Sequence, residues 1–234
     1  MNIEWRQIMD IQKKSDLYLH SIMCLIGGFL GAYAILIRCN NLGSAQTANL
    51  LYVVLLFLGR NVKEFALRAL GAILYFLAIE LYVYLSYKTK INIQRYSIIV
   101  NMTGCFILCF ISPDAEPIIG LFPIFFMMAT QWSVFHGANG YNSSTIFSTN
   151  NLRQTALAIG EYFCNKDKKQ LEKMKFFANS LLWYHIGAVI SFFACRSFSV
   201  NASLFCLIPA SIGLAVTYKD AKIFSLFIRK HTVV

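Results

Sequence analysis

Apolar residues in this chain gather into runs of about 15 to 23 residues, separated by short polar or charged stretches. A helix needs about 20 such residues to cross roughly 30 Å of hydrocarbon, and single buried strands are shorter. The pattern therefore predicts an all-α, polytopic transmembrane helical bundle of six to eight membrane segments. The expected segments are 17–37, 45–59, 65–87, 96–112, 117–135, 149–163, 176–195 and 201–218.

Two of these segments are poor candidates for independent spans. Segment 45–59 would rise only about 22 Å as a helix. Segment 149–163 has one apolar face, but it also contains Arg153 and Glu161. We expect both to be short helices sheltered by neighbouring spans. The second either lies at the membrane interface or directs Arg153 into a cavity toward an anionic group.

Composition and charge agree with a membrane location. Apolar residues make up 57% of the chain and charged residues 14%, which lies outside the range of ordinary soluble domains. The net charge of +10 comes from short loops and the C-terminal tail, so topology explains it better than nucleic-acid binding. If all eight segments cross, most Lys and Arg residues lie on the side of both termini, which predicts cytoplasmic termini. The basic loop 88–95 is the exception.

Other interpretations of the chain have less support. Charged residues and Ala32-Tyr33-Ala34 flank the first apolar run as in a signal peptide, but the run continues through Ile37 and further spans follow. The seven cysteines form no CxxC pair and have no nearby histidine at zinc spacing. We therefore expect free thiols and no metal site.

Shifting the sequence by 102 residues against itself aligns two polar blocks and suggests an internal repeat. The identical pairs are Asn40 with Asn142, Thr47 with Thr149, Asn49 with Asn151 and Leu50 with Leu152. The shift also places the first segment on the fifth and the second on the sixth, so we predict two repeats, 1–112 and 113–234. Four crossing segments per half would give the repeats the same orientation, whereas an odd number would invert them.

Each short segment follows or begins in a block rich in hydroxyl and amide side chains. These side chains can act as ordinary caps of the first helical turn. If the helix begins inside the membrane, its N–H groups and positive dipole end instead form a site for a polar or anionic ligand. The candidate ligand-binding residues are Asn40, Gln46, Thr47, Asn49, Gln131, Asn142, Thr149, Asn151 and Arg153.

Two further residues are candidates for ion or proton coupling. Glu80 lies deep in an apolar segment, where a carboxylate is costly, although it could also approach the outer interface near Lys88. His185 could relay protons near neutral pH, or it could be a neutral histidine hydrogen-bonded between helices.

The two blocks resemble those of a known family. Residues 28–33 and 46–50 are similar to the first-half pattern Gly-Tyr-Val-Asp-Ala-Tyr and Gln-Thr-Gly-Asn-Leu of the YoaK-like family, bacterial small integral membrane proteins with a domain of unknown function. Gln131, Thr145 and 149–152 resemble its second-half pattern. The resemblance implies a multi-pass protein of the bacterial cytoplasmic (inner) membrane, and it brings no substrate.

The chain departs from the family pattern at four positions. The family's aspartate falls on Gly31, its glycines fall on Ala48 and Asn150, and its second-half asparagine falls on Trp132. Ion coupling that relied on the aspartate would therefore have to work differently here.

We expect a transporter or permease-like protein for a small polar or anionic solute, with the lipid bilayer as its surroundings. The alternative is a non-transporting membrane scaffold or sensor that assembles through small-residue helix faces such as Gly27, Gly28, Gly31 and Ala32. No catalytic or ATP-binding motif stands out, so we expect no enzyme and no cofactor. We expect no nucleic-acid partner, and association into a homo-oligomer stays open.

Overall fold

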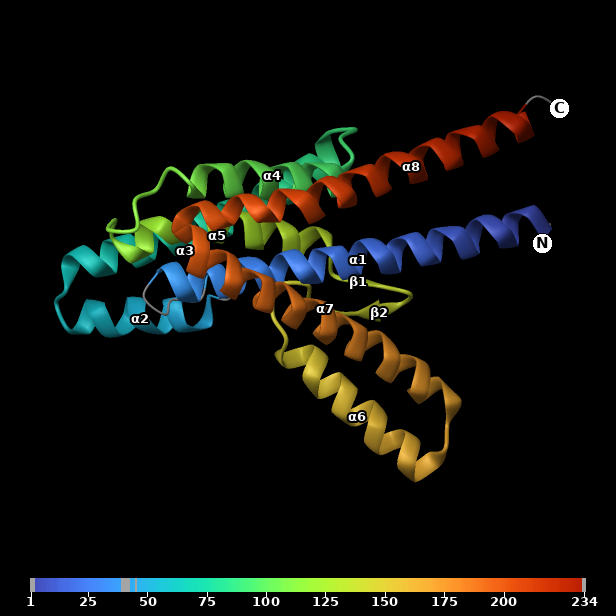
Figure 1. Cartoon of the computed structure of the whole chain (residues 1–234), viewed down its shortest axis with the longest axis horizontal. Helices are drawn as coiled ribbons and strands as arrows, with labels where there is room; N and C mark the ends of the chain where they lie inside the picture. Colours follow the sequence, from blue (N-terminus) through green and yellow to red (C-terminus); the bar gives the residue numbers. More distant parts are fainter. Residues whose placement is uncertain (1–2, 39–42, 45, 233–234) are drawn as a thin grey trace.

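The computed structural model describes residues 3–38, 43, 44 and 46–232, with side chains between residues 9 and 221. This part of the chain is helical apart from one small hairpin (Figure 1). The elements are α1 (Ile3–Ile37), α2 (Thr47–Leu58), α3 (Val62–Lys88), α4 (Ile93–Leu108), α5 (Pro117–Val134), β1 (Gly137–Ala138), β2 (Tyr141–Asn142), α6 (Thr149–Asn165), α7 (Lys168–Phe198), the 3-10 helix η1 (Ser199–Cys206) and α8 (Leu207–Thr232).

The all-α prediction is confirmed, and most helices begin and end near the predicted bounds. The main differences are at the ends, because α1, α7 and α8 continue through polar residues beyond the apolar runs. The hairpin was not predicted. Its turn depends on Asn139 and Gly140, whose φ values of 54° and 81° are easiest for Asn and Gly.

Four helical stretches of the described residues are long and apolar enough to span a membrane. They are Met9–Ile37, Val62–Lys88, Pro117–Val134 and Lys168–Ala221. The last stretch includes α7, η1 and the first part of α8, and these two helices run in opposite directions (Figure 1). The chain is therefore a helical protein of membrane type. The count of six to eight segments and the two repeats remain predictions.

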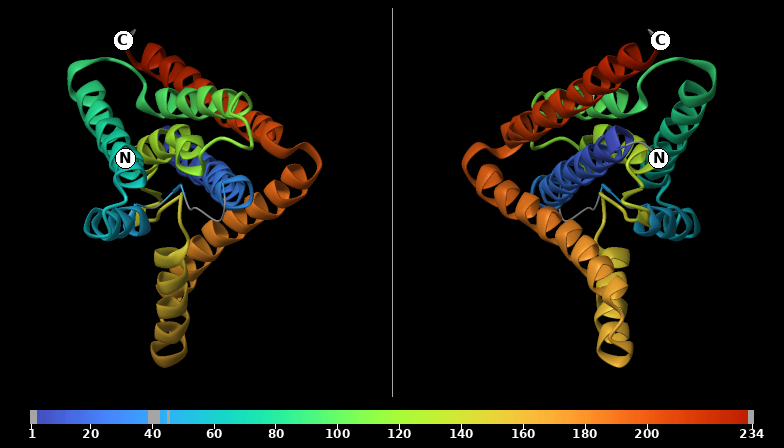
Figure 2. Two further views of the ribbon diagram at one scale, coloured as in Figure 1. Left: turned by 90° about the vertical axis from the view of Figure 1, so that its left-hand side faces the viewer. Right: turned by 90° about the vertical axis from the view of Figure 1, so that its right-hand side faces the viewer.

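Helices that are distant in the sequence pack side by side in two pairs (Figures 1 and 2). α1 packs along α7, and α3 packs along α5. The first pair touches through backbone, because a Cβ atom at Gly28 would lie 1.8 Å from the Tyr184 carbonyl oxygen, and one at Gly187 would lie 2.0 Å from that of Leu25. Only glycine permits such an approach.

α1 and α5 run in opposite directions (Figure 1). His20, early in α1, lines a small cavity together with Val134 at the end of α5. The residue after α1, Arg38, lies beside Gly120 at the start of α5. Arg38 is fully buried, and its guanidinium donates hydrogen bonds to the carbonyl oxygens of Ser112 (2.8 Å) and Ile111 (3.1 Å).

Both short helices begin inside the bundle rather than at one of its ends. α2 forms a hairpin with α3, and α6 forms a second hairpin with α7 (Figure 1). The two hairpins extend toward opposite ends of the molecule (Figure 1). The two short helices are sheltered only in part, because Asn49, Asn151 and Ala158 are their only buried residues and the rest of each helix is half-buried or exposed.

Candidate functional site

A pocket of about 390 Å³ lies where the N-termini of the two short helices come together. Gln46 and Thr47 contribute to it from the start of α2, and Thr149 contributes from the start of α6. The full lining is Gln46, Thr47, Leu50, Tyr75, Trp132, Phe147 and Thr149. The two polar blocks that the sequence singled out therefore share one pocket.

Neither helix N-terminus at this pocket is capped by a side chain. Gln46 and Ser148 hold the N-cap positions of α2 and α6, and neither makes a capping hydrogen bond. By contrast, Asn61, Asn92 and Asp167 accept hydrogen bonds from the first turns of α3, α4 and α7. The interpretation of the blocks as ordinary caps is thus wrong for these two positions. Amide groups in the first turns of α2 and α6 can bind a ligand.

The lining of the pocket is uncharged and largely apolar, with polar groups contributed mainly by Gln46, Thr47 and Thr149. Within the described part of the chain, no Asp, Glu, Lys, Arg or His lines it. Three aromatic rings form its walls, and the Trp132 ring packs edge-on against Phe147 with centroids 5.2 Å apart. The positive ends of two helix dipoles face a ligand with hydrogen-bond acceptors, while the rings contact its apolar parts.

Asn49 and Asn151 lie behind the pocket and hold the two N-termini in place. Asn49 is 5% exposed, and its Nδ2 donates to Gln46 Oε1 (2.8 Å) and to the Arg68 carbonyl oxygen on α3 (3.1 Å). Asn151 is 1% exposed; its Nδ2 donates to the Ser144 carbonyl oxygen (2.8 Å), and its Oδ1 accepts from Ser143 Oγ (2.9 Å). Both amides are therefore occupied by the protein itself.

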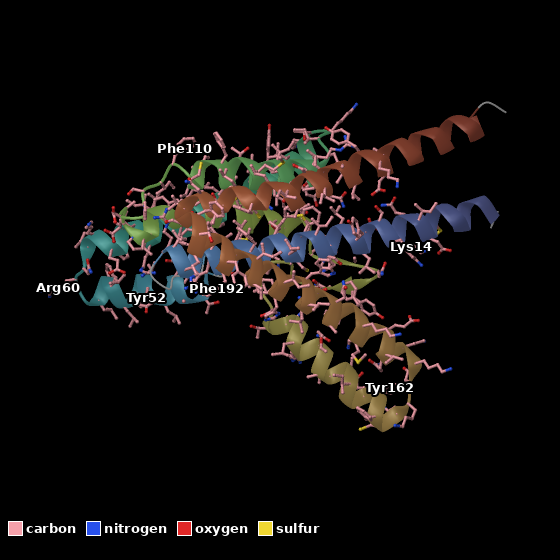
Figure 3. The ribbon with its side chains drawn as sticks, in the orientation of Figure 1. Lys14, Tyr52, Arg60, Phe110, Tyr162 and Phe192 are labelled. Atoms are coloured by element: carbon pink, nitrogen blue, oxygen red, sulfur yellow. The ribbon has the colours of Figure 1, made fainter. Side chains whose placement is uncertain are left out.

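The Asn49 anchor includes an ion pair. The Arg68 guanidinium lies 3.5 Å from Asn49 Oδ1 and 2.9 Å from a Glu64 carboxylate oxygen. It also stacks over the Tyr52 ring of α2, 4.3 Å from the ring centroid. Tyr52 lies on the α2–α3 hairpin, at the end of the molecule opposite the chain termini (Figure 3). This network fixes α2 to α3.

Gln131 is fully buried and joins four parts of the fold. Its Nε2 donates to the Met23 carbonyl oxygen on α1 (2.9 Å) and to Thr145 Oγ1 in the loop before α6 (3.0 Å). Its Oε1 accepts from Asn101 Nδ2 on α4 (2.7 Å). The next residue, Trp132, lines the pocket. Gln131 thus supports the pocket wall and the adjacent loop rather than lining the pocket.

The remaining sequence candidates are not at the pocket. Asn142 is exposed in β2, Arg153 is exposed on α6, and Glu80 is exposed on α3. His185 is also exposed, with its Nδ1 2.7 Å from the Leu181 carbonyl oxygen of its own helix. Asn40 lies outside the described residues.

Several residues at the site were missed by sequence reasoning. Tyr75 and Phe147 carry no signal, because the chain has many similar residues in its apolar runs, and Leu50 was noticed only as a position of the repeat and the family motif. His20 could have been noticed, since it is an isolated histidine inside the apolar part of the first segment. Its Nε2 lies 3.1 Å from Ser143 Oγ, next to the Asn151 anchor.

Comparison with known proteins agrees with this architecture. The model of the family described as "Protein of unknown function (DUF1275)" matches residues 19–218. Neither a curated protein nor a solved structure matches the chain. The matched region runs from α1 into α8 and contains the whole pocket. The family match agrees with the resemblance to YoaK-like proteins, and the chain belongs to the DUF1275 family of proteins of unknown function.

Proposed function

We propose that this protein transports a small polar or anionic solute across the bacterial inner membrane, through the pocket between the N-termini of α2 and α6. One observation carries the proposal: both polar blocks line a single pocket, and neither helix start there is capped by its N-cap side chain. Broken helices that meet in this way form substrate sites in many secondary transporters.

The packing of the helices supports an arrangement of two inverted repeats. The 102-residue shift matches α1 with α5 and α2 with α6, and α1 and α5 run in opposite directions (Figure 1). The pair of α1 and α7 then corresponds to the pair of α5 and α3. If α2 and α6 only dip into the membrane, each half has three crossing helices, which is the odd number that inverted repeats require.

This topology also accounts for the basic loop 88–95. With three crossing helices per half, the loop lies at the same end of the molecule as both termini (Figure 1). The turn between α6 and α7, which carries Lys166, Lys168 and Lys169, points toward the same end (Figure 1). A cytoplasmic position of this end follows the positive-inside rule.

The lining indicates the chemistry of the solute. The first-turn amides of two helices, together with Thr47 and Thr149, suit a solute with carboxylate, carbonyl or hydroxyl oxygens. A pocket of about 390 Å³ admits a small organic molecule rather than a bare ion. No ATP-binding motif stands out in the sequence, so we expect energy for active transport to come from an ion gradient or a partner protein.

Solute binding to the purified protein tests the proposal. A panel of small polar and anionic solutes is screened for an increase in melting temperature, because a bound solute stabilises the folded state by mass action. Changing both Thr47 and Thr149 to Val removes two hydroxyls from the pocket with little change in volume. We expect the double variant to lose most of the shift caused by the best solute.

Thr103→Val is the matched control, because Thr103 is exposed on α4 and lines a different, apolar groove. It is expected to keep the full shift. If the double variant responds to the solute like the wild-type protein, the site assignment is wrong. If no solute in the panel shifts the melting temperature or enters proteoliposomes, the alternative of a non-transporting scaffold or sensor is favoured.

A further inference from the structure

His20 is a buried histidine that joins α1 to the loop before α6. It is 2% exposed, and its ring stacks on Phe176 of α7 with centroids 5.4 Å apart. Its Nε2 lies 3.1 Å from Ser143 Oγ, and Ser143 Oγ lies 2.9 Å from Asn151 Oδ1. His20 is therefore two hydrogen bonds away from the first turn of α6, which lines the candidate pocket.

The hydrogen bonds determine which nitrogen of His20 carries a proton. Asn151 Nδ2 donates to the Ser144 carbonyl oxygen, so Asn151 Oδ1 must accept from the Ser143 hydroxyl. Because Ser143 has only one hydroxyl proton, its Oγ accepts from His20 Nε2–H. In the neutral imidazole, Nδ1 then has a free lone pair and can accept a proton.

A second cavity, of about 200 Å³, lies next to His20 at the end of the molecule that holds both termini. Asp16, His20, Gln94 and His136 contribute its polar groups. His20 Nδ1 is buried, and no group in the described part of the chain forms a hydrogen bond with it. The cavity is large enough for several waters, so it provides a route for protons.

Few other titratable groups surround His20. Asp16 and His136 share the cavity, and Cys24 lies one turn further along α1. From α7, the neighbouring side chains are the neutral Phe176 and Ser180. A proton that enters from the N-terminal end therefore meets Asp16 and His136 at the cavity before it reaches His20.

We propose that His20 Nδ1 binds a proton from this cavity, and that the bound proton controls the loop and α6 N-terminus at the candidate pocket. The proton adds to the Nδ1 lone pair, Nε2–H is kept, and the imidazolium gains an attraction toward the Asp16 side of the cavity. The positive charge strengthens the hydrogen bond from Nε2–H to Ser143 Oγ, and this alters the hydrogen bond from Ser143 to Asn151. The inference rests on the proposed function in one respect, namely that the pocket binds the solute. In that case the bound proton changes the affinity for the solute, and the bound solute changes the affinity for the proton by the same factor.

Trp132 fluorescence tests the inference without any solute, because Trp132 lines the pocket and packs on Phe147 of the same loop. In a Trp5→Phe, Trp183→Phe background, Trp132 is the single tryptophan. We expect its emission to change reversibly as the pH is lowered through the acidic range, where the buried imidazole takes up a proton. His20→Gln should abolish the change, because the glutamine amide can still donate to Ser143 but does not titrate. His185→Gln, which changes an exposed histidine that does not line this cavity, should keep it.

A pH response that survives His20→Gln, or no response in the parent protein, would overturn the inference. If His20→Gln does not fold, ¹⁵N NMR of the histidines in the parent protein replaces it. His20 must then start as the Nε2–H form and titrate; an Nδ1–H form or a signal that does not titrate rules the inference out. A His20-dependent response without solute binding would keep this inference and remove the proposed function.

Discussion

The two short helices occupy matching positions, but the protein anchors them differently. At the start of α2, Asn49 donates to the backbone carbonyl oxygen of Arg68, whose guanidinium lies 3.5 Å from Asn49 Oδ1 and pairs with Glu64. At the start of α6, Asn151 is held by the neutral hydroxyl of Ser143, which binds His20. An ion pair between Arg68 and Glu64 stays formed over a wide pH range, whereas a histidine can take up a proton when the pH is lowered. The anchor of α6 is thus the one that we expect to respond to pH.

The surroundings of the two helices also differ, because α2 is exposed and apolar whereas α6 is more polar and packs on α7. Apart from Asn49, α2 buries none of its residues deeply, and its exposed residues such as Leu51, Leu55 and Phe57 suit contact with lipid. α6 is more polar, and it depends on α7, which in turn touches α1 through glycines. The stability of the second anchor therefore depends on the α1–α7 contact.

The largest expected effect comes from breaking that contact with Gly187→Ala. The new Cβ atom would lie 2.0 Å from the Leu25 carbonyl oxygen, and backbone atoms cannot move aside independently. We expect a loss of about 3 kcal/mol or more, at the upper end of overpacking effects. The melting temperature can be followed by a maleimide dye that reacts with the buried thiols of Cys24, Cys105 and Cys206 as the protein unfolds.

Gly213→Ala in α8 is the control for this substitution. Its Cβ atom would meet side-chain atoms at 3.4 to 3.6 Å, which is ordinary contact. A helical Gly→Ala change without a clash stabilises by roughly 0.5–1 kcal/mol. Similar melting temperatures for the two variants would show that the α1–α7 contact is not as tight as described.

Replacing each anchor by alanine compares the two halves directly. Asn151→Ala removes the side-chain donor of the buried Ser144 carbonyl and leaves the Ser143 hydroxyl only the longer contact to Ser180 as an acceptor, and we expect a loss of about 2–3 kcal/mol. Asn49→Ala should cost about 1 kcal/mol, because Arg68 keeps its bond to Glu64. The melting temperatures of the two variants, measured with the same thiol-reactive dye, show which substitution costs more. Equal melting temperatures, or a lower one for Asn49→Ala, would contradict the proposed difference between the anchors.

Removing the ion pair with Glu64→Gln should have a smaller effect. The Glu64 side chain is 34% exposed, so solvent screens its attraction to Arg68, and a loss of about 1 kcal/mol or less is expected. Added salt should reduce the difference from the wild-type protein. Glu116→Gln is the matched control, since its partner Lys63 is 79% exposed and no measurable loss is expected. A loss of several kcal/mol in either variant would be inconsistent with this picture.

The smallest expected effect is a gain from Gly160→Ala in α6. No atom lies within 4 Å of the position that its Cβ would take, and a glycine inside a helix is unfavourable. We expect roughly 0.5 kcal/mol of added stability, measured as a small rise in melting temperature. A fall would mean that this face of α6 packs against something, such as a second copy of the chain.

The sequence predicted the helices and the polar starts of α2 and α6 because long apolar runs and their interruptions are local features. It also named Thr47 and Thr149 as ligand-binding candidates, and both line the pocket. It did not separate lining residues from anchors: Asn49 and Asn151 follow the two threonines by only two positions, and the direction of a side chain depends on the neighbouring helices. The aromatic wall was missed for a related reason, because Tyr75 and Phe147 look like residues that face lipid.

The burial of Arg38 has a consequence for how the protein is assembled during synthesis. Its guanidinium binds carbonyl oxygens 73 and 74 residues later in the chain, and it fits against the bare backbone of Gly120. When α1 leaves the ribosome and enters the bilayer, none of these groups has been made. These contacts of Arg38 can therefore form only after α5 has begun to be synthesised, so the end of α1 reaches its final packing late although it is made first.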